Sequence, residues 1–325
     1  MNRKDPQHWA FFEPFDPVEG TVIREPVGEG TGYWVGAPGV MYDANDEGFY
    51  LLYRVRRPRG VQPDRGAKIH LATSRNGIEF ETIWTGTKDQ LDSTSIERCA
   101  IRRLSVDQWV LYVSYVDPAD GRWRIDYVLA DQPAAFDFRN AKRVLTAEDI
   151  GAEGIKDPFL FQVAGLYHMI VSIAKTSGPA DADQLHGTND AYNTGLIRSA
   201  TGLATSHNGI DWQWDGEVFA PGNSGWDKYC SRIGTLWQED GIWLALYDGS
   251  ADFSQNYEEQ VGLAFSHDLR TFHRVSREAP LMLPPSGHGA IRYFDVLALP
   301  DATFFYYEMI RPDGSHDLRV FRRGT

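Results

Sequence analysis

The stretch Phe49-Tyr-Leu-Leu-Tyr-Arg54 is one of five short aromatic and aliphatic segments in this 325-residue chain. The other four are Trp109-Val-Leu-Tyr-Val-Ser-Tyr115, Leu166-Tyr-His-Met-Ile-Val-Ser172, Ile242-Trp-Leu-Ala-Leu-Tyr-Asp248 and Thr303-Phe-Phe-Tyr-Tyr-Glu-Met309. Their first residues are 60, 57, 76 and 61 positions apart. Aromatic and β-branched residues favour strands, and one strand type repeated at a similar interval indicates a repeated supersecondary unit.

Each segment follows another expected strand and a short turn rich in Asp, Asn, Glu and Gly, which is a hairpin signal. The expected first strands are 33–42, 95–104, 155–163, 229–237 and 290–299. We therefore predict an all-β fold, a five-bladed β-propeller with about four antiparallel strands per blade. The chain would form a single domain, 1–325, with blades at approximately 30–86, 92–146, 153–219, 226–277 and 286–323.

A second repeat supports this organisation. Leu71-Ala-Thr-Ser-Arg-Asn-Gly-Ile-Glu-Phe80 is matched by Leu203-Ala-Thr-Ser-His-Asn-Gly-Ile-Asp-Trp212. We interpret Ser-x-Asn-Gly as a structural turn between third and fourth strands, because Gly adopts positive φ without strain. Residues 19–26 are expected to pair with the last blade and close the ring. The long insertion 176–195 either shapes a pocket or is a tolerated surface loop.

The composition excludes several classes of protein. The net charge is −13, which argues against a general nucleic-acid or anionic-membrane binder. Neither a signal peptide nor a membrane span is found in the sequence, so we expect a cytoplasmic protein. Cys99 and Cys230 are expected to be buried free thiols. No metal-ligand motif or cofactor fingerprint is present, so we predict neither a metal nor a cofactor. The oligomeric state, including a homo-oligomer, is left open.

Carboxylates at the start of the first strands are the candidates for chemistry. Ala37, Glu97 and Asp157 are spaced by 60 and 60 residues, which predicts equivalent positions in three blades. Side chains there would converge on a central funnel, and two carboxylates facing a pocket suit cleavage of a glycosidic bond. We predict Glu97 and Asp157 as the acid and base pair, with Asp227 as a third candidate. Their roles within the pair are not assigned.

Other polar and aromatic residues near these positions are candidates for substrate binding. Arg98 and Lys156 adjoin the two carboxylates and would also modify their pKa values. The full predicted binding set is Arg98, Lys156, Trp226, Tyr229, Arg232, His288, Arg292 and Asp295. The basic run Arg54, Arg56, Arg57 and Arg59 is interpreted as a solvated loop face.

Several segments resemble a known family. Ala37-Pro-Gly-Val40, Lys156-Asp-Pro-Phe-Leu-Phe161 and Gly241-Ile-Trp-Leu-Ala-Leu-Tyr247 are similar to blades of the β-mannoside phosphorylases and β-mannosidases, glycoside hydrolase family 130. The resemblance overlaps with arabinanase-like and fructosidase-like five-bladed hydrolases. It implies cleavage of glycosides through funnel carboxylates. The mannoside family has Glu-Asp-Pro-Arg at the start of blade two, where this chain has Glu97-Arg-Cys-Ala100. Arabinanase-like relatives have Asp-Pro at the start of blade one, where this chain has Ala37-Pro38.

These observations predict a glycoside hydrolase that acts on a carbohydrate substrate. One alternative is a carbohydrate-binding propeller without catalysis, in which an inherited acid is missing. Another is a glycoside phosphorylase that requires inorganic phosphate. A third is a sialidase-like enzyme, which would need three funnel arginines around a carboxylate and a sixth blade; no sixth repeat is found.

Overall fold

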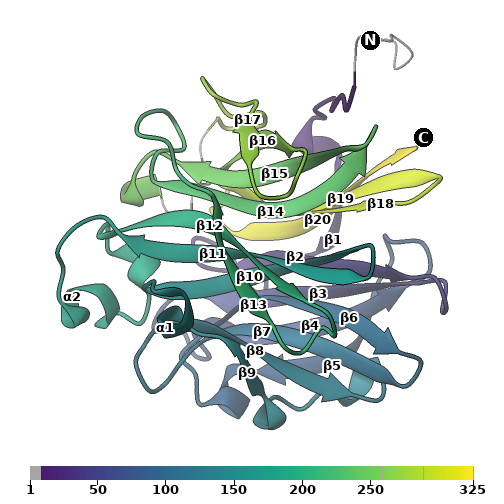
Figure 1. Ribbon diagram of the computed structural model, residues 1–325, viewed down its shortest axis with the longest axis horizontal. Coiled ribbons are helices and arrows are strands. Elements are labelled where there is room, and N and C mark those ends of the chain that lie inside the picture. The colour runs from purple at the N-terminus through teal and green to yellow at the C-terminus, as the bar shows by residue number, and fades with distance from the viewer. Residues whose placement is uncertain (1–8, 256, 258, 288, 325) are drawn as a thin grey trace.

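The computed structural model describes residues 9–255, 257, 259–287 and 289–324. Almost all regular structure in them is β-strand, as predicted, and Figure 1 shows the strands with α2 at the edge of the molecule. The helices are α1 (Ala147–Ile150) and α2 (Ala182–His186), and the 3-10 turns are η1 (Pro17–Glu19), η2 (Lys88–Leu91), η3 (Pro133–Ala135), η4 (Phe138–Asn140), η5 (Ala191–Asn193) and η6 (Phe253–Gln255). None of the described helices is long and apolar enough to cross a membrane.

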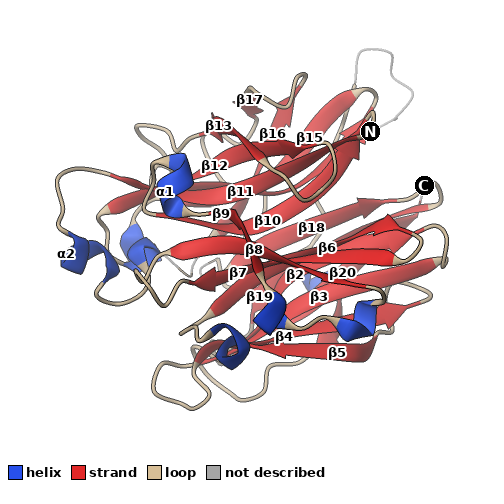
Figure 2. Cartoon of the chain, turned by 60° about the horizontal axis from the view of Figure 1, so that its bottom comes forward, coloured by secondary structure: helices blue, strands red, loops and turns tan. Residues whose placement is uncertain are grey.

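Within the described residues the strands form five antiparallel runs of four, seen from another side in Figure 2. The first two runs are β2 (Trp34–Asp43), β3 (Gly48–Arg57), β4 (Arg65–Ser74) and β5 (Glu81–Thr87), then β6 (Ile96–Ser105), β7 (Gln108–Val116), β8 (Trp123–Ala130) and β9 (Lys142–Leu145). The third and fourth are β10 (Gly154–Val163), β11 (Leu166–Thr176), β12 (Ile197–Ser206) and β13 (Gln213–Phe219), then β14 (Cys230–Glu239), β15 (Ile242–Ser250), β16 (Gln260–Ser266) and β17 (Phe272–Arg274). The fifth is β18 (Ile291–Ala298), β19 (Ala302–Ile310), β20 (His316–Gly324) and β1 (Thr21–Arg24).

The repeated segments occupy the same place in every run. Each aromatic segment quoted above lies in the second strand, β3, β7, β11, β15 or β19, and each expected first strand is found within two residues of its predicted bounds. β1 pairs antiparallel with β20, so an N-terminal segment completes the last run, as predicted. The first strands β2, β6, β10, β14 and β18 contact one another in this order, and β18 also contacts β2.

Hydrophobic clusters lie between consecutive runs. One cluster joins β6, β7 and β8 to β10, β11 and β12, and includes Tyr112 and Leu160. Another joins the last run to the first, with Leu51 packed in the same cluster as Phe304 and Val320. Both cysteines are buried and free, as predicted. Because the second strands are apolar on both faces, each can pack against a neighbouring run on either side.

The Ser-x-Asn-Gly turns have the predicted structural role. In the turn between β4 and β5, the Ser74 hydroxyl accepts hydrogen bonds from the N–H groups of Asn76 and Gly77, at 3.2 and 3.0 Å. Gly77 has φ +73°, and a Cβ there would lie 2.8 Å from the ring of Phe49. The turn therefore requires glycine for both conformation and space.

Candidate active site

A β-bulge in the first strand of four runs directs one residue away from the strand ladder. In β2, β6, β10 and β18 two residues oppose a single residue of the second strand, and the first of the two is Ala37, Glu97, Asp157 or Tyr293. Ala37, Asp157 and Tyr293 have positive φ, at 50°, 59° and 56°. Bulges re-aim a side chain in this way. The 60-residue spacing predicted from sequence thus corresponds to equivalent strand positions.

Glu97 is buried among arginines. Its carboxylate forms an ion pair with Arg54, and Oε1 lies 3.4 Å from Arg56 Nη1. Burial would raise the pKa of Glu97, but the positive charges of Arg54, Lys156 and Arg56 outweigh it and hold this pKa below its usual value. Glu97 is therefore ionised at neutral pH.

Asp157 is buried but much less engaged. Its backbone N–H donates to Ser114 Oγ at 2.8 Å, whereas neither carboxylate oxygen accepts a hydrogen bond from a described residue. The closest cation is Lys156, with Nζ 3.7 Å from Oδ2. Lys156 Nζ itself lies 5.0 Å from the ring centre of Trp123 and 4.4 Å from that of Tyr192. Because buried polar atoms are normally satisfied, this carboxylate indicates a place for a ligand group.

Alternating charges extend from Glu97 through the centre of the molecule. Arg54 bridges Glu97 and Glu308, and Arg292 bridges Glu308 and Glu259 at 2.7 Å each. Arg232 then pairs with Glu259 at 2.6 Å. These residues form the inner network: Arg54, Glu97, Arg232, Glu259, Arg292 and Glu308. The arginines lower the pKa of Glu308, and that of Glu259 to about 2, against the opposing effect of burial.

Asp248, on β15, adjoins this network and was not predicted as a site residue. Its Oδ1 accepts a hydrogen bond from the Tyr293 N–H at 3.0 Å, and Oδ2 is 3.8 Å from Arg232 Nη2. Burial raises the pKa of Asp248 to about 7, and nearby Glu259 contributes in the same direction. The carboxyl therefore takes up a proton near neutral pH.

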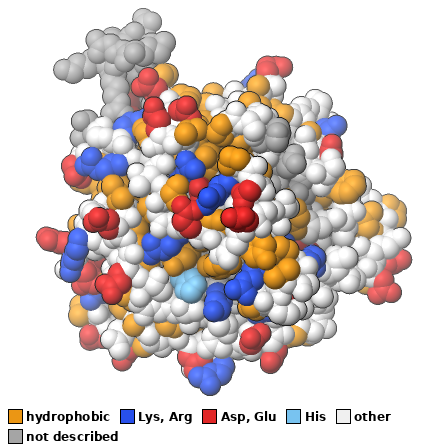
Figure 3. Space-filling model, turned by 180° about the vertical axis from the view of Figure 1, so that it is seen from behind, with side chains coloured by type: hydrophobic (Ala, Val, Ile, Leu, Met, Phe, Trp, Pro, Cys, Tyr) orange, Lys and Arg blue, Asp and Glu red, His pale blue; other side chains and the backbone are white. Residues whose placement is uncertain are grey.

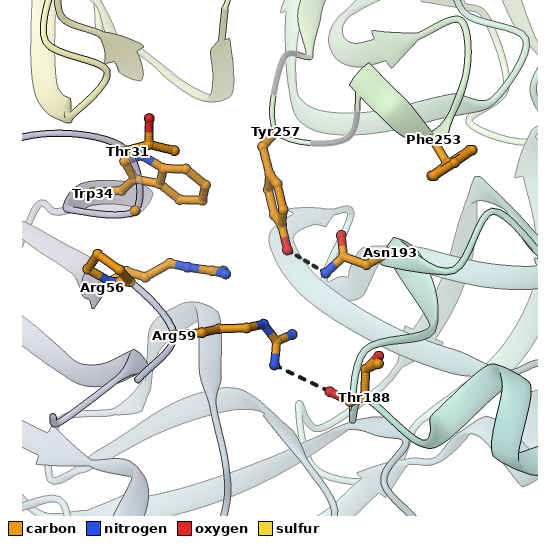
Figure 4. A pocket seen from close by; sticks show the side chains of 10 residues that line it. Thr31, Trp34, Arg56, Arg59, Thr188, Asn193, Phe253 and Tyr257 are labelled. Atoms are coloured by element: carbon orange, nitrogen blue, oxygen red, sulfur yellow. Dashed lines mark hydrogen bonds between the residues drawn. The ribbon is translucent and has the colours of Figure 1, made fainter. Parts of the chain in front are cut away.

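Two cavities share Arg56 and Tyr257. The inner cavity has a volume of about 10 Å³, at the lower limit for one water molecule. Its lining is Arg54, Arg56, Glu97, Lys156, Asp190, Tyr192, Arg232, Tyr257, Glu259, Arg292 and Tyr293. The outer cavity, shown in Figure 4, has about 630 Å³ and is lined by Thr31, Gly32, Trp34, Arg56, Pro58, Arg59, Thr188, Asn193, Phe253 and Tyr257. The outer cavity alone is large enough for sugar rings.

The insertion 176–195 contributes to both cavities. Asp190 and Tyr192 line the inner cavity, whereas Thr188 and Asn193 line the outer one. Asp190 is held in place by the indole N–H of Trp123, which donates to its Oδ1 at 3.3 Å. Of the two alternatives for this segment, a pocket-shaping loop is the one observed.

The other predicted residues divide into two groups. Lys156, Arg232 and Arg292 line the inner cavity with Glu97. Arg98 and Asp295 are brought together elsewhere: Arg98 Nη2 is 2.7 Å from Asp295 Oδ2, and the guanidinium also donates to the carbonyls of Pro38 and Gly234. These two residues form a central tie between first strands. His288 lies outside the described residues.

The predicted residues around β14 lie apart from both cavities. Asp227 accepts hydrogen bonds from Arg274 Nε at 2.7 Å and from the Tyr247 hydroxyl at 3.0 Å. Trp226 stacks on Tyr247, with ring centres 5.6 Å apart. Tyr229 lines a different surface cavity of about 350 Å³, which adjoins the outer cavity through their common residue Phe253.

The interpretation of the basic run as a solvated loop face is wrong for two of its members. Arg54 and Arg56 lie on β3, where alternate residues share a face, and both side chains are buried among Glu97, Trp34 and Tyr293. The sequence signal for the inner network was a charge inside an apolar strand, as at Arg54 and at Glu308 in β19. Buried charges of this kind are nearly always paired.

The fold is similar to that of solved carbohydrate-active enzymes. A glycosyl hydrolase from Bacteroides ovatus matches with a TM-score of 0.61 and 14% identity, covering 97% of this chain and 94% of that chain. A β-1,2-mannobiose phosphorylase from Listeria innocua matches with a TM-score of 0.57 and 14% identity, covering 92% of each chain. A thermostable family-43 glycoside hydrolase matches with a TM-score of 0.61 and 13% identity, covering 89% of each chain.

No protein-family model matches this sequence, and no curated protein is similar to it. At identities of 13–14% the structural likeness shows the fold. The resemblance to glycoside hydrolases and mannoside phosphorylases, predicted from strand and turn motifs, is confirmed at this level: the chain has the fold of these enzymes.

Proposed function

We propose that this chain is a glycosidase built as a single five-bladed β-propeller domain, which acts on a carbohydrate in the cytoplasm. Five antiparallel runs of four strands, with first strands that contact one another in order, support the blade count. The likeness to solved glycoside hydrolases supports the reaction class. The observation that carries the proposal is the presence of Glu97 and Asp157 at the same bulge position of neighbouring runs.

The two carboxylates differ in a way that suits the reaction. Cleavage needs an ionised group that activates water or stabilises charge at the sugar carbon, and an acid that protonates the leaving oxygen. Glu97 is held ionised by Arg54, Lys156 and Arg56, so it fits the first role. Asp157, whose oxygens accept no hydrogen bond from the described residues, is left for the second. Asp227 is the weakest of the three candidates, because Arg274 and Tyr247 already bind its carboxylate.

The volumes of the two cavities locate the glycan. The inner cavity, at about 10 Å³, is too small for a sugar ring, whereas the outer cavity has about 630 Å³. Trp34 and Tyr257 offer aromatic faces in the outer cavity, which suit stacking of a sugar ring. The scissile bond would therefore lie near the junction of the cavities, where Arg56 and Tyr257 line both.

A carbohydrate-binding protein without catalysis is the second candidate. It is favoured by the ion pairs of Glu97, which give this carboxylate a structural partner, and by the small inner cavity. It predicts that sugar binding survives both Asp157→Asn and Glu97→Gln, with no turnover of any substrate by the wild type.

The experiment is hydrolysis of a panel of aryl pyranosides and furanosides by the wild type, Asp157→Asn and Glu97→Gln, each with and without inorganic phosphate. Asp107→Asn is the matched control, since it makes the same change at an exposed turn residue. Turnover lost by at least about a hundredfold in Asp157→Asn, and retained in Asp107→Asn, is the expected result. Turnover that requires phosphate would instead identify a phosphorylase, and equal activity in Asp157→Asn would remove Asp157 from the mechanism.

A further inference from the structure

The charged side chains of the outer cavity are all basic among its described lining residues. Arg56 lies near the end of β3 and Arg59 in the loop that follows, and Figure 4 shows both guanidinium groups pointing into the space between Trp34 and Tyr257. The other polar side chains of this lining are Thr31, Thr188, Asn193 and Tyr257. The wall therefore offers mainly hydrogen-bond donors, and two of its groups carry a full positive charge.

Neither arginine is fully used by the protein. The side chain of Arg59 is 46% exposed; its Nη1 is 3.4 Å from the Thr188 carbonyl oxygen and its Nη2 is 3.8 Å from Asp190 Oδ2. Arg65 Nη2 lies equally far from that same oxygen, so two arginines share one carboxylate at long range. Arg56 is 3.4 Å from Glu97 Oε1, and its guanidinium lies 4.9 Å from the Trp34 ring centre and 5.2 Å from that of Tyr257. Each guanidinium has five N–H donors, so both keep donors for a ligand.

The arginines of the inner network differ in this respect. Arg54, Arg232 and Arg292 surround the Tyr293 ring, with distances of 5.7, 5.9 and 5.1 Å to its centre. Each of the three, however, lies within ion-pair distance of two carboxylates. An arginine cluster is present as a sialidase-like site would require, but its charges are already compensated. Arg56 and Arg59 are the cations that remain for a bound group.

The local charge is opposite to that of the whole protein. The chain has 45 acidic and 32 basic residues, and on the face shown in Figure 3 both kinds are interspersed. The inner cavity wall nevertheless carries five basic side chains against three carboxylates, and the outer wall adds Arg59. A neutral sugar would require a balance of donors and acceptors. A donor-rich wall with two arginine forks is complementary to a carboxylate, which arginine binds with two parallel hydrogen bonds.

We propose that the outer cavity binds an acidic sugar of the uronic acid class, with its carboxylate held by Arg56 and Arg59. This rests on the proposed function, because it assumes that the cavity holds the glycan. It goes further by stating the chemical class of the substrate and the two residues that select it. Trp34 and Tyr257 would contact the sugar ring while the guanidinium groups hold its carboxylate.

The test is isothermal titration calorimetry of the full-length protein with aryl glucuronides and galacturonides of both anomers, each against the matching neutral aryl hexoside. We expect the acidic member of at least one pair to bind about tenfold or more tightly than its neutral partner. Inorganic phosphate and sulfate are titrated separately. Arg59→Gln should remove the preference by weakening the acidic ligand about tenfold while changing the neutral one less than about twofold.

Arg57→Gln is the matched control, because Arg57 lies two residues away and lines neither cavity. It should leave the preference intact. Equal binding of acidic and neutral ligands, equal weakening of both by Arg59→Gln, or no binding of any sugar would overturn the proposal. Binding of phosphate in an Arg59-dependent manner without any preference for uronides would also overturn it, and would indicate a free oxyanion site.

The two proposals fail in distinguishable ways. Selective uronide binding with no turnover of any glycoside would remove the catalytic function and keep the acidic-sugar site. Turnover of neutral glycosides with no effect of Arg59→Gln on substrate preference would keep the glycosidase and remove the acidic-sugar site. Arg59 is suited to this separation because its side chain is half exposed, so its substitution does not open the core.

Discussion

The inner network and the outer cavity use the same residue type for different ends. Beneath Arg56, the charges of Arg54, Arg232 and Arg292 are matched by Glu97, Glu259 and Glu308, and the side chains are almost completely buried. Above it, Arg59 has only long contacts and a half-exposed side chain. What separates a structural arginine from a ligand-binding one here is how many of its donors are already satisfied. The predictions below test this difference, from the largest expected effect to the smallest.

Removing one acid from the inner network should have the largest effect. Glu308→Gln would leave Arg54 and Arg292 without the charge that both share, and a broken buried ion pair costs about 3–5 kcal/mol. Urea unfolding should show a decrease in the free energy of unfolding of this size. The matched control, Glu29→Gln at an exposed position, should change it by less than about 0.5 kcal/mol. A similar stability for both variants would mean that the network is not structural.

Asp157→Asn should separate activity from stability. The carboxylate accepts no hydrogen bond from the described residues, so its loss removes only the 3.7 Å contact with Lys156. We expect kcat on a responsive aryl glycoside to decrease at least about a hundredfold, while the free energy of unfolding stays within about 1 kcal/mol of the wild type. A strongly destabilised variant would show that Asp157 belongs with the inner network instead.

Asp248 should give the inner region a pH-dependent stability. Its pKa is raised from 3.8 to about 7, so the folded state binds a proton more tightly than the unfolded state. This contribution to stability is complete below about pH 4 and is lost as the pH rises through 7. Between pH 5 and pH 8 it should decrease the free energy of unfolding by roughly 2 kcal/mol.

Asp248→Asn keeps an oxygen that can accept from the Tyr293 N–H but does not titrate. Urea unfolding at the two pH values should therefore show a smaller difference for this variant than for the wild type. Glu259, with a pKa of about 2, titrates well below this window and does not interfere. Identical pH dependence in the variant and the wild type would contradict the assignment.

Arg59→Gln should have the smallest effect on stability. The side chain is 46% exposed and its ion-pair distance is 3.8 Å, so the pair is screened by solvent. We expect the free energy of unfolding to change by less than about 0.5 kcal/mol, as measured by urea unfolding. A loss comparable to that of Glu308→Gln would erase the distinction between the two regions.

Local patterns in the sequence were sufficient for the strands. The segment from Phe49 and its four counterparts, the hairpin turns, and the Ser-x-Asn-Gly turn at Gly77 are set by residue propensities and by conformations that involve only neighbouring residues. The equivalence of Glu97 and Asp157 also followed from spacing alone, because a constant repeat places equal positions at equal places in each run.

The candidate site was only partly visible in the sequence. Arg98 and Asp295 were expected to contact substrate, yet they bind each other at 2.7 Å. Arg54 was assigned to a solvated loop, although the alternation of β3 turns it inward toward Glu97. A charged residue in an apolar strand indicates burial, but its partner comes from a strand distant in the chain, such as Glu308 for Arg54. Spacing and composition carry no information about such pairs.

The sequence by itself determined the strands, their turns and the positions that recur from run to run, because these depend on local propensity and on the period of the repeat. The tertiary structure alone decided which charges are paired and which face a cavity. It placed the insertion at Thr188 and Asp190 against Arg59, and it surrounded Glu97 with arginines from another run. The physical reason is that burial and pairing energies depend on distances between residues brought together only when the runs pack.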